Sequence, residues 1–233
     1  GKSINAINFT MPKGKRYLQD VFVTTPHGLI KKNRTGIGAT TLELNSPRNS
    51  IIVVPTRALA YGKAISSKIE GESDKYRVLY VGGNITGFVV PEISDYLMDS
   101  SIRYKKFIVV ADSLPRLLHI IGEEHYKDYF LMIDEIDSYQ YDCSYRPNME
   151  NVMDYYFQFP VSHRCLVSAT IGEFSNKNII EEPVINVQFD NSQSRNINLI
   201  HTDNAEIRLK KLIEEIATAN PDDKILIAYN SVK

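Results

Sequence analysis

Two segments about a hundred residues apart carry side chains that could together bind and hydrolyse a nucleotide. The first, Thr35–Thr41, is a glycine-rich turn that leads into a predicted helix. The second, Leu131–Asp137, is an apolar run followed by three carboxylates. Backbone N–H groups of a glycine-rich turn can point at phosphate oxygens, and carboxylates at a strand end can hold Mg²⁺ and orient water. The two segments therefore predict the two halves of an NTPase site.

Aligned on the phosphate-loop pattern G-x-x-x-x-G-K-[ST], residues 33–40 keep the second glycine and the hydroxyl residue but lack the lysine. Ala39 stands where the pattern has lysine, so another cation must grip the β- and γ-phosphates, and Arg34 or Lys32 could do so. Thr40 is predicted to contribute a hydroxyl to Mg²⁺. The alternative is a turn that binds nothing. The predicted nucleotide-binding residues are Lys32, Arg34, Thr35, Gly36, Ile37, Gly38, Ala39, Thr40 and Thr41.

The carboxylates after the apolar run suit two different tasks. Asp134 is predicted to hold Mg²⁺ together with Thr40, and Glu135 to orient and deprotonate the attacking water. Asp137 would couple the site to neighbouring loops. A solvated acidic turn is the alternative, but the carboxyl end of a buried strand is where open α/β sheets bind ligands.

The elements that must position these residues read as alternating strands and helices. Continuous apolar runs of four or five residues indicate strands covered on both faces of a parallel sheet. We expect strands at 50–54, 77–81, 107–110, 130–133 and 165–167, and helices at 57–70, 113–126 and 149–158. This alternation predicts an α/β fold with three layers and a doubly wound, mostly parallel sheet.

The chain is expected to contain one domain and the start of another. Residues 1–16 are assigned to an N-terminal extension and 17–190 to the α/β domain. Residues 195–233 are interpreted as the start of a second α/β domain whose remainder is missing. Its predicted elements are strands at 196–201 and 225–229 and a helix at 206–219, with Leu209, Leu212, Ile213 and Ile216 facing inward.

An ordered series of motifs resembles the first RecA-like motor domain of superfamily 2 helicases of the DEAD-box-like sort. Residues 35–41 resemble motif I, and Pro55-Thr56-Arg57-Ala58-Leu59-Ala60 resembles motif Ia. Gly82-Gly83 lies where the family has a GG element, and residues 112–117 resemble motif Ib. Residues 134–137 resemble motif II, and Ser168-Ala169-Thr170 resembles motif III. Residues 225–231 resemble motif IV, which opens the family's second RecA-like domain.

The resemblance implies a RecA-like P-loop NTPase domain that uses ATP and Mg²⁺ and acts as a nucleic-acid helicase or translocase. It also implies that five residues contact a nucleic-acid strand: Thr56, Arg57, Gly83, Ser113 and Arg116. Ser168 and Thr170 would join Asp137 in linking the nucleotide state to domain movement. DNA is expected as the partner in preference to RNA. The sequence has no motif VI, which carries the family's arginine finger, so hydrolysis by this chain alone should be weak.

Composition narrows the function classes and leaves one alternative open. The net charge of −1 argues against a bulk electrostatic nucleic-acid binder, and no apolar run is long enough for a membrane span. Two cysteines suit a reducing, cytoplasmic setting. The basic cluster Lys13-Gly14-Lys15-Arg16 could touch nucleic acid, but it is interpreted as a solvated tail. The alternative to a motor is a non-catalytic nucleotide- or nucleic-acid-binding module, since Ala39 argues for decay of the phosphate loop and the Asp134-Glu135 pair argues against it.

Overall fold

The computed structural model describes residues 6–66, 77–82, 93–139, 146–169, 177–190 and 200–219. The chain divides into two compact units, Gly1–Asp190 and Asn191–Lys233. The first unit contains the sheet and both predicted site segments. None of the helices in the described residues is long and apolar enough to cross a membrane.

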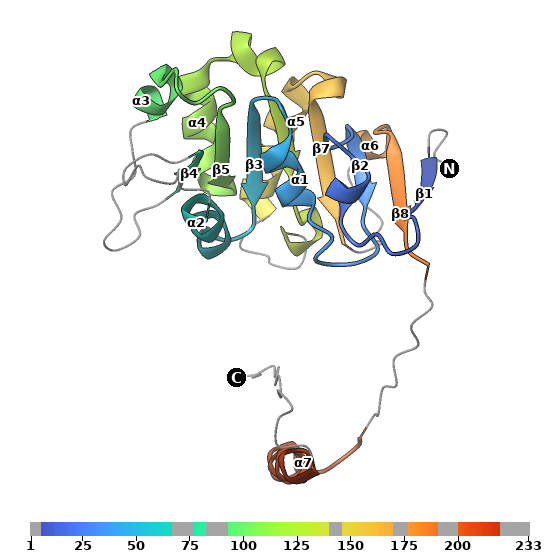
Figure 1. The fold of residues 1–233 in the computed structure, drawn as a ribbon. Coiled ribbons are helices and arrows are strands. Elements are labelled where there is room, and N and C mark those ends of the chain that lie inside the picture. Colours follow the sequence, from blue (N-terminus) through green and yellow to red (C-terminus); the bar gives the residue numbers. More distant parts are fainter. Residues whose placement is uncertain are drawn as a thin grey trace. The chain divides into compact units, whose positions relative to one another are not determined.

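Within the described residues, eight strands of the first unit form one sheet in which every neighbouring pair is parallel (Figure 1). The spatial order is β1-β8-β2-β7-β6-β3-β5-β4. The strands are β1 (Ala6–Thr10), β2 (Gly28–Lys31), β3 (Ser50–Val54), β4 (Val78–Val81), β5 (Lys106–Val110), β6 (Phe130–Ile133), β7 (Arg164–Ser168) and β8 (Val184–Gln188). Every residue of β3 to β7 is buried, as their continuous apolar sequences predict. The α/β fold class is confirmed.

Helices cover both faces of this sheet, because successive residues of a strand point to opposite sides. Ile51 and Val53 pack in the core that includes α3, α4 and α5, whereas Ile52 and Val54 pack in the core that includes α1 and α2. The helices are α1 (Ala39–Asn45), α2 (Arg57–Ile65), α3 (Ile93–Met98), α4 (Leu114–Ile121), α5 (Arg146–Gln158) and α6 (Lys177–Ile180). Short 3-10 helices are η1 (Leu18–Asp20), η2 (Ala111–Ser113), η3 (Glu123–Asp128), η4 (Ile136–Tyr139) and η5 (Val161–His163).

Three strands at one side of the sheet were not predicted. The sequences of β1, β2 and β8 are short and mix apolar with polar residues, so no continuous apolar run marks them. Ala6–Thr10 pairs with β8 along its whole length, so these residues belong to the sheet although the sequence assigned them to an extension. The helix expected over 113–126 ends at Ile121, because Gly122 adopts a φ of 85° that a helix cannot continue.

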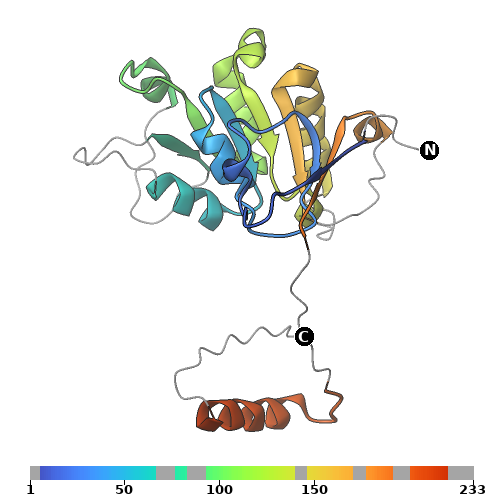
Figure 2. The ribbon, with the colours of Figure 1, turned by 45° about the vertical axis from the view of Figure 1, so that its right-hand side comes forward.

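The described part of the second unit consists mainly of α7 (Ala205–Ala219), seen lengthwise in Figure 2. This helix was predicted within one residue. None of its residues is buried, and Leu209, one of the residues expected to face inward, is exposed. The expected strand at 225–229 and most of the one at 196–201 lie outside the described residues.

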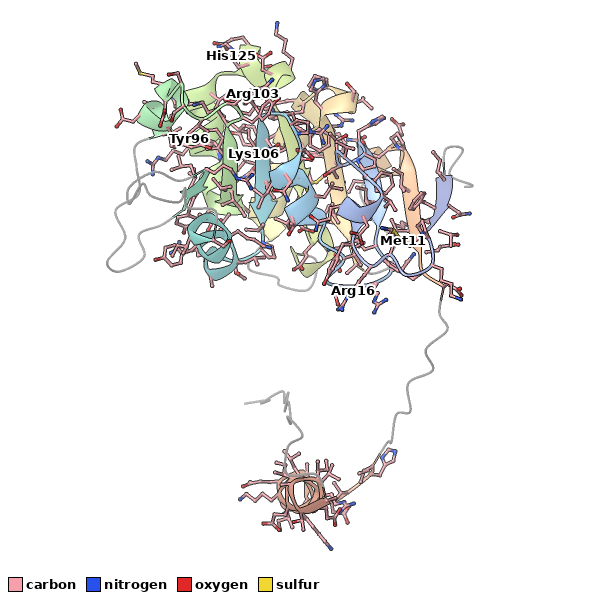
Figure 3. The ribbon with its side chains drawn as sticks, in the orientation of Figure 1. Met11, Arg16, Tyr96, Arg103, Lys106 and His125 are labelled. Atoms are coloured by element: carbon pink, nitrogen blue, oxygen red, sulfur yellow. The ribbon has the colours of Figure 1, made fainter. Side chains whose placement is uncertain are left out.

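A buried lysine organises the amino-terminal edge of the sheet. Lys106, labelled in Figure 3, is buried where β5 begins. Its Nζ donates hydrogen bonds to the carbonyl oxygens of Glu43 and Ser46 and to Ser50 Oγ, each at 2.8 Å. The Glu43 carboxylate in turn accepts hydrogen bonds from Ser50 and Arg48. These contacts tie the carboxyl end of α1 to the first residues of β3 and β5. Burial lowers the pKa of Lys106 to about 8.

We therefore predict that Lys106→Met destabilises the fold by about 3 kcal/mol or more, because it leaves the buried carbonyl oxygens of Glu43 and Ser46 without their donor. Urea unfolding measures this loss, and Lys127→Met, at an exposed position, should change stability by less than about 0.5 kcal/mol. Equal stability of the two variants would contradict this role for Lys106.

Candidate functional site

The candidate site lies at the carboxyl ends of adjacent parallel strands. β7 lies between β2 and β6, so the residues that follow these strands are close together although they are far apart in the sequence. The backbone N–H of Lys32, after β2, donates to the Ser168 carbonyl at 2.8 Å. The backbone N–H of Asp134, after β6, donates to the Val53 carbonyl at 2.9 Å. Backbone pairing therefore fixes both residues at one edge of the sheet.

Asp134 is the centre of the site. Its Oδ1 accepts hydrogen bonds from Lys32 Nζ at 3.3 Å and from the Glu135 backbone N–H at 2.9 Å. Its Oδ2 accepts a hydrogen bond from Thr40 Oγ1. Asp134 and Lys32 are each only 4% exposed. A carboxylate with this little access to water needs such partners, because burying an unpaired charge is costly.

The glycine-rich turn connects Lys32 to Thr40 and is held in place by its apolar residues. Gly36 and Gly38 have φ values of 71° and 79°, a left-handed conformation that glycine adopts without a steric penalty. Between them Ile37 is buried, and its carbonyl accepts a hydrogen bond from the Leu18 backbone N–H at 2.9 Å. Thr35 and Gly36 are exposed. The turn thus presents backbone to solvent while Ile37 anchors it to the core.

The two candidate replacements for the missing lysine lie in different environments. Ala39 is buried in the core under the turn. Lys32 reaches Asp134 from the end of β2. Arg34 is exposed, and its guanidinium carbon lies 5.4 Å from the centre of the Phe189 ring. Of the two, Lys32 is the cation that reaches Asp134, the carboxylate that also accepts a hydrogen bond from Thr40.

Glu135 adopts a backbone conformation that is unusual for a residue with a side chain. Its φ is 53°, which costs of order 1 kcal/mol and persists only where surrounding contacts enforce it. Burial raises the pKa of its carboxyl above the ordinary value of 4.5, and the neighbouring Asp134 raises it further, whereas Lys32 lowers it. A strained residue whose pKa is perturbed by specific neighbours is typical of functional sites.

Asp137 connects the acidic segment to the segment after β7. Its Oδ1 accepts a hydrogen bond from the Ala169 backbone N–H at 3.3 Å. Ser168, at the end of β7, is fully buried. Thr170 lies outside the described residues. The contact brings the segments that resemble motifs II and III together, but it uses the backbone of Ala169.

Four of the five residues expected to contact nucleic acid lie at the same edge of the sheet. Thr56 and Arg57 follow β3, and Ser113 and Arg116 follow its neighbour β5, so both pairs lie beyond the carboxyl ends of paired strands. Arg57 and Arg116 are exposed. The Thr56 hydroxyl accepts a hydrogen bond from the Leu59 N–H at 3.3 Å and therefore caps α2. Ser113 makes no such side-chain capping bond. Gly83 lies outside the described residues.

Tyr17 is a site residue that sequence reasoning missed. A Cβ added to Gly38 would lie 3.6 Å from Cδ1 of Tyr17, so the aromatic ring borders the glycine-rich turn. Tyr17 is 39% exposed, and the Arg16 guanidinium carbon lies 5.5 Å from its ring centre. In the sequence, Tyr17 is distinguished only as an aromatic residue next to Leu18, which packs in the core. The sequence does not reveal that Tyr17 lies beside the glycine-rich turn.

Comparisons with known proteins support the fold. No family model matches the chain, and no curated protein matches it. Among solved structures, the DEAD-box helicase Mss116 bound to single-stranded RNA and UDP-BeF is similar, with a TM-score of 0.51 and 15% identity. Mss116p with a double deletion of its NTE and C-tail, bound to single-stranded RNA and AMP-PNP, is also similar, with a TM-score of 0.50 and 15% identity. Each match covers 86% of this chain and 46% of the other. The chain therefore has a RecA-like α/β fold similar to that of a DEAD-box helicase.

Proposed function

We propose that the chain is a nucleotide-binding motor domain that binds ATP with Mg²⁺ and couples hydrolysis to movement on a nucleic-acid strand. The observation that carries the proposal is the contact of Lys32 and Thr40 with one buried carboxylate, Asp134, beside an exposed glycine-rich turn. This arrangement combines a cation for phosphate, a hydroxyl and a carboxylate for a metal ion, and backbone N–H groups.

Mg²⁺ fits the oxygen donors that meet at this point. It prefers carboxylate and hydroxyl oxygens together with phosphate oxygens, and Asp134 and Thr40 supply the two protein donors. Within the described residues, no group of three histidine, cysteine or acidic side chains could form a separate metal site. When bound, the ion would neutralise negative charge on the phosphates.

Lys32 is the proposed replacement for the lysine of the usual phosphate loop. Its ammonium is already at the site, paired with Asp134, and its long side chain can turn from the carboxylate toward a phosphate group. Arg34 lies against Phe189 and takes no part in this pairing. The role of the missing lysine is thus assigned to a residue that precedes the turn.

Glu135 is the proposed general base. Burial and the neighbouring Asp134 raise the pKa of its carboxyl, which makes it a stronger base than an ordinary glutamate. Asp137, with Ser168 and Thr170, would pass the nucleotide state to neighbouring segments. The nucleic acid on which the chain would move is suggested by the two similar structures, both of which hold single-stranded RNA. RNA is therefore the first polymer to test, and the expected preference for DNA gains no support from the comparisons.

A non-catalytic binding module remains the second candidate, favoured by Ala39 at the lysine position. Such a module would bind nucleotide or nucleic acid without hydrolysis. Removal of the proposed base distinguishes the two candidates, because it stops a motor and leaves a binding module unchanged.

We predict that Lys32→Ala lowers ATP affinity by about 10- to 100-fold, the value of a charge-assisted hydrogen bond, whereas Arg34→Ala changes it by less than about threefold. Isothermal titration calorimetry with a non-hydrolysable ATP analogue measures both affinities. Because Lys32→Ala leaves Asp134 without its cation, Lys32→Arg serves as a folded variant that keeps the charge. A larger loss in Arg34→Ala than in Lys32→Ala would contradict the assignment.

We predict that Glu135→Gln lowers single-turnover ATP hydrolysis by about 10²- to 10⁴-fold with unchanged nucleotide affinity, because the amide cannot accept the water proton. In the unmodified protein, hydrolysis should fall with decreasing pH as Glu135 becomes protonated. This fall should occur above pH 4.5, since its pKa is raised. Hydrolysis should be measured with single-stranded RNA present. An unchanged rate in Glu135→Gln would refute the assigned base, whereas nucleotide binding without hydrolysis by the unmodified protein would leave the binding module.

A further inference from the structure

Basic side chains are concentrated around the glycine-rich turn. Residues 11–40 contain six lysine or arginine residues and one acidic residue, Asp20, in a chain whose net charge is −1. Lys32 is buried in the site, and Lys31 is only partly exposed. Four cations of this stretch are exposed: Lys13, Lys15, Arg16 and Arg34. We call these four residues the basic rim.

The basic rim is built on ordered backbone and not on a solvated tail. Lys15 N–H donates to the Pro12 carbonyl at 3.0 Å, which closes a turn in which Gly14 has a φ of 83°. Met11 and Leu18, on either side of the turn, are buried in the core. Met11 N–H also donates to the Gln188 carbonyl at 2.8 Å, which fixes the turn at the ends of β1 and β8. The three basic side chains of residues 13–16 are therefore held at a defined place on the surface.

The charges of the rim are only partly offset by a neighbouring carboxylate, Asp20, which interacts electrostatically with Lys15 without forming an ion pair with it. Asp20 accepts hydrogen bonds from the backbone N–H groups of Arg16 and Tyr17 at 3.2 and 3.0 Å. In the part of the chain that the structure describes, no rim side chain forms an ion pair with a carboxylate. Arg16 and Arg34 lie instead near the aromatic rings of Tyr17 and Phe189. Guanidinium groups held on aromatic rings keep their N–H donors available for phosphate.

We propose that the basic rim is a second contact surface for the phosphate backbone of a nucleic-acid strand. It lies at the carboxyl-terminal edge of the sheet, as do Thr56, Arg57, Ser113 and Arg116, but at the β1-β8-β2 side. Arg34 follows β2, and three strand spacings, about 14 Å, separate β2 from β3 in the sheet. Lys13, Lys15 and Arg16 follow β1, which lies two strands beyond β2.

The bound nucleotide does not account for these cations. The charged and polar groups at the turn are already supplied by Lys32, Thr40 and Asp134. The other cations, Lys13, Lys15 and Arg16, precede Tyr17 in the sequence, whereas the turn follows it. Three cations on one exposed turn match a polyanion whose charges repeat along its length. The inference takes its ligand class from the proposed function but does not depend on hydrolysis.

The test is the salt dependence of binding to a 20-nucleotide single strand of RNA or DNA, measured by fluorescence anisotropy without nucleotide. Replacing Lys13, Lys15 and Arg16 together by glutamine should reduce the slope of log K against log salt by about 2, since each phosphate contact contributes about 0.7. ATP affinity should stay unchanged. The RNA and DNA arms show which polymer the rim prefers.

The matched control removes the same charge from the opposite edge of the sheet through Arg77→Gln, Arg103→Gln and Lys127→Gln. These residues are exposed, and Figure 3 shows Arg103 and Arg16 at opposite edges. The control should keep the slope of the parent chain. An unchanged slope in the rim variant, or an equal reduction in the control, would overturn the proposal. Loss of ATP affinity with an unchanged slope would also overturn it. If the rim variant binds the strand with an unchanged slope, only the proposal for the rim is refuted. If the parent chain does not bind the strand at all, nucleic-acid binding as a function is refuted as well.

Discussion

The Asp134 carboxylate is the interaction on which the site depends. It joins the end of β2 through Lys32, the first turn of α1 through Thr40, and the end of β6 through the Glu135 backbone. Each of these segments is fixed by the parallel sheet or by core packing, so the carboxylate meets its partners without a long flexible loop. Because Asp134 is buried, losing any partner leaves a charge poorly compensated. The same constraint that stabilises the buried carboxylate therefore brings together the groups that a nucleotide would need.

The position of the cation is the chemical departure from the usual phosphate loop. Ala39, at the start of α1, is buried in the core, whereas Lys32, at the end of β2, pairs with Asp134. A positive charge therefore lies at the carboxylate although the phosphate-loop pattern lacks its lysine. The exposed cations around the turn add positive potential on the same side.

Sequence alone predicted the centre of the fold better than its flank. Strands that are buried on both faces have continuous apolar sequences, and for this reason β3 to β7 were all predicted. β1, β2 and β8 have mixed sequences whose place in the sheet depends on pairing with distant residues. The site shows the same division. The spacing of motifs singled out Thr40 and Asp134, which the structure brings into contact. Only the fold shows that Lys32 and not Arg34 reaches this carboxylate, because the two residues differ completely in burial. The contact of Tyr17 with Gly38 is equally invisible in the sequence.

The central claim is that Lys32 supplies the missing phosphate-binding charge, and a crystal structure with a non-hydrolysable ATP analogue tests it most directly. The account predicts that Lys32 Nζ lies within hydrogen-bonding distance of a β- or γ-phosphate oxygen while Arg34 remains away from the phosphates. A structure in which Lys32 still pairs only with Asp134 and Arg34 contacts the phosphates would contradict the account.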